Sequence, residues 1–422
     1  MAAKRVKIDY DEEVKSRPNT MAEDRISLLP DRLIYHIFSF LPTIYIVQMS
    51  VISQRWRYIW LSTPFIYFDF HTSSDRVRKR VMFLNFLTNS LRCRKQYMRV
   101  PKTSITSFKC EMSSSFPSGA TRRIDDWLSF VVRMKVKELH LYGGGYCLPQ
   151  FVLSASSLTV LKLRNMKLET PSPSHFPSLK VLSLSDVEVY SQSLQNLVSG
   201  CPIIEDLHLE KYNFGAPISF EGFFLGSYTF RGLDLAVSGT LKNISFSRVE
   251  ITDQWLDRLI SRLPLLERLT FWRCRWKSIS IRTHSLKYLF CDVFNMREAD
   301  LRTPNLVFLH LTCFAESNIS VEAFQQLETN LYVRDSSMNK TSYYDLVRLL
   351  SNLKCLKKMT LTTECESALI IQKGVRNMSL PPLPNLKHLT LKIHGRLTRN
   401  LKLEESLLWC APSVEAIEIY AS

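Results

Sequence analysis

Glycine is scarce in this sequence of 422 residues, which contains 12 glycines and 9 histidines. The Gly-Gly-Gly run at 143–145 has neither the GxGxxG spacing nor the lysine of a phosphate-binding loop. The 10 cysteines include no CxxC pair, and none lies at zinc-finger spacing from a histidine. A nucleophile-elbow motif is also absent. We therefore expect no cofactor, no metal and no catalytic centre.

The sequence also lacks a signal peptide and any apolar run long enough to cross a bilayer. We expect reduced, structural cysteines in an intracellular protein that makes no membrane contact. Hydrophobic residues nevertheless make up 45% of the chain and aromatic residues 11%, which is enough to bury a large core. Because 422 residues exceed the usual size of one compact core, several domains or an elongated repeat array is expected.

Acidic residues are fewer than basic ones: 39 Asp and Glu face 55 Lys and Arg, for a net charge of +16. Such an excess suits proteins that bind nucleic acid or a membrane surface. Here the basic residues are spread along the chain, and the densest stretch, 76–95, alternates with apolar residues as in an amphipathic helix. This distribution favours solvated basic faces, so nucleic acid is a disfavoured partner.

The first 25 residues are polar and lack periodicity, which predicts a disordered basic tail. Within the tail, Lys4, Arg5 and Lys7 resemble a single-cluster nuclear import signal. The alternative interpretation is an inert tail. If the segment is an import signal, the protein is expected in both nucleus and cytoplasm.

Residues 26–70 show apolar positions three and four apart in three short stretches, which predicts three short amphipathic helices. Pro30 suits the start of the first, Ser53 is a cap for the third, and Pro64 ends the unit. Three short helices bury too little on their own, so the unit needs a partner.

The same residues resemble an F-box. Residues 29–31 read Leu-Pro-Asp, 41–42 read Leu-Pro, and 53–60 read S-x-R-W-R-x-x-W. The resemblance implies that the helices bind a Skp-type adaptor, and through it a cullin–RING ligase, although residues 43–45 lack the charged residue that is frequent there. The alternative is a helical cap on the repeats. The implied adaptor-binding residues are Leu29, Pro30, Ile34, Ile37, Phe38, Leu41, Pro42, Val47, Val51 and Trp56.

From Val136 onward, a pattern of apolar residues, Φ-x-x-Φ-x-Φ, recurs every 20 to 30 residues or so, the period of leucine-rich repeats. Each unit buries its apolar side only by stacking on its neighbours, which predicts a solenoid. The segments are 136–141, 158–163, 179–184, 204–209, 241–246, 266–271, 286–291, 306–311, 356–361, 386–391 and 414–419.

The segments 200–205, 263–267 and 410–415 each lead into a predicted strand in the same way, with a proline near the start and a glutamate at the end. They resemble the repeat junctions of plant-type F-box/leucine-rich-repeat proteins, which extends the likeness over nearly the whole chain. The expected fold is an α/β repeat: a short three-helix F-box followed by a curved solenoid with a parallel β-sheet on its concave face. We expect the F-box at 26–70, a linker region with helices and a possible first irregular repeat at 71–135, and the solenoid at 136–422.

Because alternate side chains of a strand point to opposite faces, the residues between the buried positions should line the concave surface. Around 266–312 these residues are unusually aromatic, and clustered Trp, Tyr and Arg are typical of binding hot spots. The alternative is that a loop or the C-terminal segment covers them. The predicted substrate-binding residues are Arg268, Trp272, Tyr288, Phe290, Phe308 and His310.

The family resemblance implies a substrate-recognition subunit of an SCF-type (Skp–cullin–F-box) E3 ubiquitin ligase. The F-box would bind the adaptor, and the repeats would bind a protein substrate whose identity the sequence does not give. Such a subunit contributes proximity, not side-chain chemistry, and is not itself an enzyme. Two alternatives are a nucleic-acid-binding and a small-molecule-sensing repeat protein.

Overall fold

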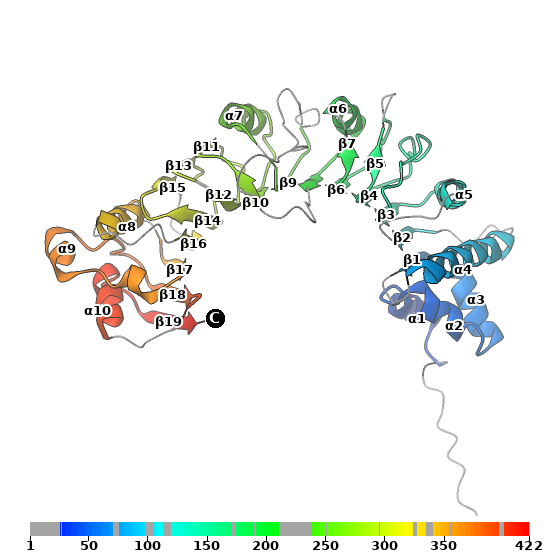
Figure 1. Ribbon diagram of the computed structural model, residues 1–422, viewed down its shortest axis with the longest axis horizontal. Helices are drawn as coiled ribbons and strands as arrows, with labels where there is room; N and C mark the ends of the chain where they lie inside the picture. The colour runs from blue at the N-terminus through cyan, green and yellow to red at the C-terminus, as the bar shows by residue number, and fades with distance from the viewer. Residues whose placement is uncertain are drawn as a thin grey trace, which may run out of the picture.

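The computed structural model describes residues 26, 28–70, 76–97, 105–112, 120–169, 174–189, 191–210, 234, 239–249, 251–294, 296–323, 327–334, 341–353, 356–395 and 401–421. These residues form an arc (Figure 1). Three short helices lie at its N-terminal end, strands line its inner side, and most other helices lie on its outer side. The α/β repeat fold predicted from the sequence is confirmed.

The N-terminal helices are α1 (Asp31–Phe38), α2 (Thr43–Met49) and α3 (Gln54–Ser62), which we call the helical trio. The Ser53 hydroxyl accepts a hydrogen bond from the Trp56 backbone N–H and caps α3, as the sequence predicts. The trio has a small core separate from that of the repeats. Its buried members are Ile34, Phe38, Ile46, Trp56, Ile59 and Trp60.

The main sheet has 14 parallel strands among the described residues, and each strand pairs with the next one along the arc. They are β1 (Phe65–Asp69), β2 (Ser107–Glu111), β3 (Glu138–Tyr142), β4 (Val160–Arg164), β6 (Val181–Ser185), β8 (Asp206–Glu210), β9 (Asn243–Ser247), β10 (Arg268–Arg275), β12 (Tyr288–Phe294), β14 (Phe308–Phe314), β16 (Glu328–Arg334), β17 (Lys358–Thr363), β18 (His388–Ile393) and β19 (Ala416–Ala421).

The segments that return from strand to strand are mostly helical. They include α4 (Arg76–Tyr97), α5 (Ala120–Arg133), α6 (Ser191–Ser199), α7 (Asp253–Ser261), α8 (Thr341–Ser351), the 3₁₀ helix η1 (Glu366–Leu369), α9 (Lys373–Met378) and α10 (Leu401–Cys410). In the middle of the arc, a three-stranded sheet of β11 (Ser278–Arg282), β13 (Glu298–Arg302) and β15 (Asn318–Glu322) takes their place. A short pair, β5 (Lys167–Leu168) and β7 (Glu188–Val189), lies nearer the N-terminus. Across the described ranges, no helix has the length and apolar character needed to span a membrane.

Strand alternation explains why the repeats stack. In β3, Leu139 and Leu141 are buried while the residues between and beside them are partly exposed. The register places Leu139 beside Leu161 of β4, and Leu161 beside Leu182 of β6. Each strand thus buries its leucines against its neighbours in one continuous core, and its other side chains are left for the concave face.

The sheet differs from the predicted repeats at two places. It begins before Val136: β1 lies within the predicted F-box range 26–70, and β2 lies in the region 71–135, where a possible first irregular repeat was predicted. A further strand, β16, lies in the gap between the predicted segments 306–311 and 356–361. One of its buried positions is Thr329, which hides the repeat in the sequence.

Candidate functional site

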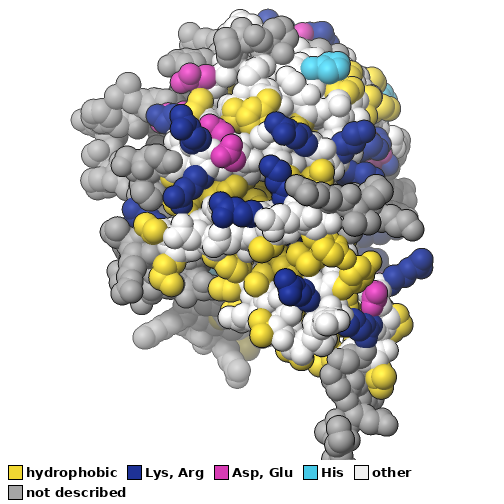
Figure 2. Space-filling model, turned by 90° about the vertical axis from the view of Figure 1, so that its right-hand side faces the viewer, with side chains coloured by type: hydrophobic (Ala, Val, Ile, Leu, Met, Phe, Trp, Pro, Cys, Tyr) yellow, Lys and Arg dark blue, Asp and Glu magenta, His cyan; other side chains and the backbone are white. Residues whose placement is uncertain are grey.

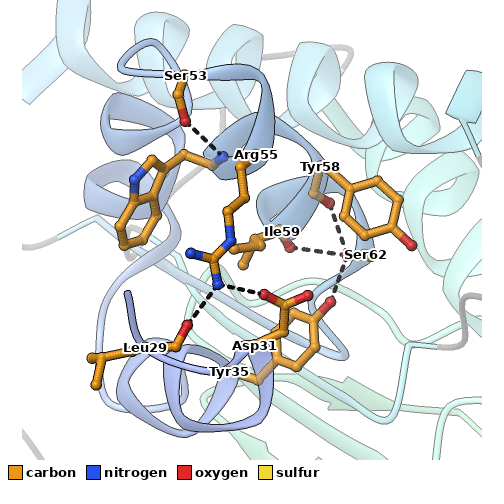
Figure 3. A network of polar contacts seen from close by, with 9 residues as sticks. Leu29, Asp31, Tyr35, Ser53, Arg55, Tyr58, Ile59 and Ser62 are labelled. Carbon is orange, nitrogen blue, oxygen red and sulfur yellow. Dashed lines mark hydrogen bonds and ion pairs between the residues drawn. The ribbon is translucent and has the colours of Figure 1, made fainter. Parts of the chain in front are cut away.

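A polar network joins α1 to α3 in the helical trio (Figure 3). The Arg55 guanidinium donates to the backbone carbonyl of Leu29 at 2.6 Å and to the Asp31 carboxylate at 2.8 Å. Elsewhere along the same two helices, the hydroxyl oxygens of Tyr35 and Ser62 lie 2.8 Å apart. The arginine of the R-W-R segment therefore ties α3 to the Leu-Pro-Asp segment that begins α1.

Replacing Arg55 by alanine is expected to lower the free energy of unfolding by about 1 kcal/mol, because two charge-assisted hydrogen bonds at a partly exposed site are lost. Arg55→Lys should recover part of this loss, since it keeps the charge. The measurement is the urea midpoint followed by tryptophan fluorescence. An alanine variant with an unchanged midpoint would show that the network does not stabilise the trio.

The residues predicted to bind an adaptor divide into three groups. Ile34, Phe38 and Trp56 are buried in the trio's own core, where the rings of Phe38 and Trp56 lie 5.8 Å apart. We therefore revise their role: they support the surface from inside, because the packing of α1 on α3 removes them from it. Half-buried members are Leu29, Leu41, Pro42 and Val47, and exposed members are Pro30, Ile37 and Val51.

Several large apolar side chains that the sequence did not single out are also exposed on the trio. Phe40 and Ile52 are 71% and 70% exposed, and they join the predicted residue Val51, which is 85% exposed. Hydrophobic side chains gather on this end of the molecule (Figure 2). We call this set the exposed apolar face; it consists of Leu33, Ile37, Phe40, Ile44, Tyr45, Val51 and Ile52.

Two polar contacts fasten the helical trio to strand β1 and to helix α4. The Thr43 hydroxyl accepts a hydrogen bond from the Tyr67 backbone N–H of β1 at 2.9 Å. The fully buried Arg94 of α4 donates to the Thr63 carbonyl, and its guanidinium carbon lies 5.2 Å from the ring centroid of Trp60. Burial lowers the pKa of Arg94 to about 9. The trio is thus attached through polar groups that the apolar pattern of the sequence did not reveal.

The predicted substrate-binding residues come together on three neighbouring strands. Register places Arg268 of β10 beside Tyr288 of β12, and Tyr288 beside Phe308 of β14. Phe290 stacks between two rings: its centroid lies 5.7 Å from that of Trp272 and 4.2 Å from that of His310. We call these residues the aromatic cluster: Arg268, Trp272, Tyr288, Phe290, Phe308 and His310.

Charged groups border the aromatic cluster. The Arg268 guanidinium carbon lies 4.5 Å from the ring centroid of Tyr288, which orients both side chains. Arg334 of β16 pairs with Asp292 of β12 at 3.3 Å. Its guanidinium also lies 5.1 Å from the ring centroid of Phe294. Arg334 was absent from the predicted site because its strand, β16, was missed. Asp292 and Phe294 lie on β12, whose repeat was predicted, but they were not among the predicted substrate-binding residues.

The cluster is suited to binding. Trp272 is 40% exposed and Tyr288 38% exposed, so these two rings are not covered as a secondary core, which the sequence left as an alternative. Burial lowers the pKa of His310, which favours its neutral, stacking form. Within the described part of the chain, no three His, Cys, Asp or Glu side chains are arranged to hold a metal ion. The arrangement presents aromatic surface beside Arg268 and Arg334.

His140 lies on the concave face near the N-terminal end of the sheet, between Lys109 of β2 and Lys162 of β4. Burial, reinforced by the charge of Lys162, lowers its pKa to about 4, while Glu138 acts in the opposite direction and Lys109 adds to the decrease. His140 is therefore neutral in the folded protein well below the pH at which a free histidine accepts a proton.

This shift predicts a pH-dependent stability. Below a pH of about 6.5 the unfolded chain binds a proton at His140, and the folded chain does not until about pH 4, so stability falls as pH drops through this window. The His140→Gln variant should lose this component. The test compares urea midpoints at about pH 7.5 and about pH 5, and an equal drop in both proteins would contradict it.

Lys4, Arg5 and Lys7 lie outside the described residues, so nuclear import stays a prediction.

Comparisons with known proteins match three parts of the chain. Residues 26–68 match the F-box domain. Residues 124–221 match the LRR repeats of FBD-associated F-box protein At5g56370, and residues 218–419 match the LRR domain of At1g61320/AtMIF1. Together these matches cover the helical trio and most of the main sheet.

Similar proteins of Arabidopsis thaliana carry corresponding names. F-box/LRR-repeat protein 25 is 30% identical over 194 residues, 45% of this chain and 68% of that protein. Putative F-box/LRR-repeat protein At5g02930 is 25% identical over 409 residues, 94% of this chain and 72% of that protein. FBD-associated F-box protein At4g10400 is 34% identical over 191 residues, and the match spans 44% of its length.

Proposed function

This chain belongs to the plant F-box/leucine-rich-repeat family, and on that premise we propose that it is the substrate-recognition subunit of an SCF-type E3 ubiquitin ligase. F-box proteins generally act in SCF complexes by binding a Skp-type adaptor, and receptors of this family are generally non-catalytic. The proposal assigns this role to the helical trio and substrate binding to the repeats.

The observation that carries the proposal is the exposed apolar face. Burying large apolar side chains is favourable by about 1.5–3 kcal/mol each, so a free protein that leaves several of them in water forgoes that stabilisation. Several large exposed apolar side chains on one small helical unit are typical of a protein–protein interface. A Skp-type adaptor that covers Ile37, Phe40 and Val51 would complete the trio's incomplete core.

On the concave side, we propose that the aromatic cluster holds a protein substrate. Trp272 and Tyr288 supply rigid, exposed rings, which are the side chains that dominate binding energy at protein interfaces. The contribution to ubiquitin transfer is proximity, because a bound substrate presents its lysines at a raised effective concentration.

Ion pairs between neighbouring repeats, near the start of several strands, argue against nucleic-acid binding there. Glu205 accepts from Lys180 and Lys242, each at 2.9 Å, and these hydrogen bonds lower the pKa of Glu205. Glu267 and Lys287 form another such pair at 2.9 Å. Lysines that already pair with carboxylates are less able to neutralise phosphates and so to release the counterions of a nucleic acid. They therefore add little affinity for nucleic acid.

Complex formation tests the proposal. The full chain, co-expressed with a plant Skp-type adaptor, should elute with it as a 1:1 complex and recruit a cullin. Capture of this complex after proteasome inhibition should enrich ubiquitinated proteins. A chain that fails to bind the adaptor at about 10 μM of each protein, where a Kd of about 1 μM gives substantial complex, would contradict the adaptor role.

A further inference from the structure

A third surface, distinct from both proposed sites, lies between α4 and α5 near the N-terminal end of the arc. The two helices enclose a groove of about 510 Å³. Its floor is apolar: Leu91 and Trp127 are buried, and Phe130 and Met134 are half-buried. A floor of this kind accepts apolar side chains that a ligand would otherwise leave in water.

Cationic side chains surround this floor. Arg92 and Lys95 come from α4, and Arg123 and Arg133 come from α5; all four are exposed. Asp126 is the one acidic residue among the described residues that line the groove, so the formal charge is 4 − 1 = +3. Lys and Arg side chains are prominent on this end of the molecule (Figure 2).

These cations differ from those along the strands. Lys180, Lys242 and Lys287 each pair with a glutamate of a neighbouring repeat. In contrast, Arg92 and Arg133 form no ion pair with any residue that the structure describes. The groove therefore keeps an uncompensated positive charge beside an apolar floor.

We propose that this groove, which we call the basic groove, binds an acidic amphipathic segment of a protein partner. Carboxylates of the segment would meet Arg92, Lys95 and Arg133, while its apolar side chains would cover Trp127 and Phe130. The phosphates of a nucleic acid could meet the same cations, but Trp127 is 5% exposed and presents little ring surface on which a base could stack. This inference does not depend on adaptor binding, because none of these residues belongs to the exposed apolar face or to the aromatic cluster.

Fluorescence anisotropy of labelled synthetic peptides tests this proposal with the full chain. The probe is a 14-residue helical peptide with leucine and phenylalanine along one face and glutamate along the other. Its binding should weaken by about tenfold in the Arg92→Glu, Arg133→Glu variant, because two attractive rim charges become repulsive. Binding should also weaken as salt rises from about 50 to about 300 mM.

Matched controls distinguish an effect of the groove from an effect of the protein's net charge. The Lys277→Glu, Arg297→Glu variant changes net charge equally at exposed positions outside the groove and should bind as the wild type does. A peptide with the same apolar residues but glutamine for glutamate should bind weakly. The proposal is overturned if the wild type does not bind the acidic peptide, if both double variants bind alike, or if a 14-nucleotide oligothymidine competes as well as the unlabelled peptide.

Discussion

A chain carrying Ile37→Glu and Val51→Glu is expected to lose its Skp-type adaptor while remaining folded. Both side chains are exposed, 43% and 85%, so the glutamates stay solvated in the free protein and leave its core intact. In a complex they would be buried without a partner, at a cost of several kcal/mol, which weakens the Kd by at least about 100-fold. Titration calorimetry against the purified adaptor measures this loss.

The matched control places the same charges elsewhere. Leu265 and Val307 are also exposed apolar residues, but they lie in the repeats, so Leu265→Glu, Val307→Glu should bind the adaptor as the wild type does. Trp56→Ala is a poor substitute, because Trp56 is buried and its loss would act through unfolding. Equal adaptor affinity for both double variants would remove the exposed apolar face as the binding surface.

The sequence predicted the helical trio because its apolar spacing and caps are local features. It did not predict which apolar side chains would face out. Ile34 and Ile37 lie three residues apart on α1, yet one is buried and the other is exposed. The difference arises from the packing of α1 against α3, which Arg55 helps to fix from 24 residues away in sequence.

The repeats were predictable where leucines mark the buried positions, as in β3, β4 and β6. The strand β16 was missed because Thr329 takes one of those positions, and β2 lies in the region where only a possible irregular repeat was predicted. The aromatic cluster was found because strand alternation and one regular spacing place Arg268, Tyr288 and Phe308 in a row. The basic groove was missed as a site, since it needs α4 and α5 side by side.

Replacing Trp272 and Tyr288 by alanine is expected to remove substrate binding while leaving adaptor binding unchanged. The exposed aromatic rings at the centre of such a surface typically contribute about 2 kcal/mol or more each, so binding should weaken by at least about 30-fold. Stability should change little, because both rings lie on the concave face outside the main core. The measurement is the yield of ubiquitinated proteins captured with the adaptor-bound chain after proteasome inhibition.

The control for this prediction lies on the same strand. Phe271 points to the opposite face, is fully buried, and stacks on Phe246 with ring centroids 5.7 Å apart. Phe271→Ala should destabilise the repeats by about 3–5 kcal/mol. This variant should lose substrate binding because the repeats unfold, and its cooperative unfolding transition should be lost as well. The double alanine variant should instead keep the wild-type transition, and Trp272→Phe should restore part of the capture. If the double variant captures as much ubiquitinated protein as the wild type, the substrate does not bind at the aromatic cluster.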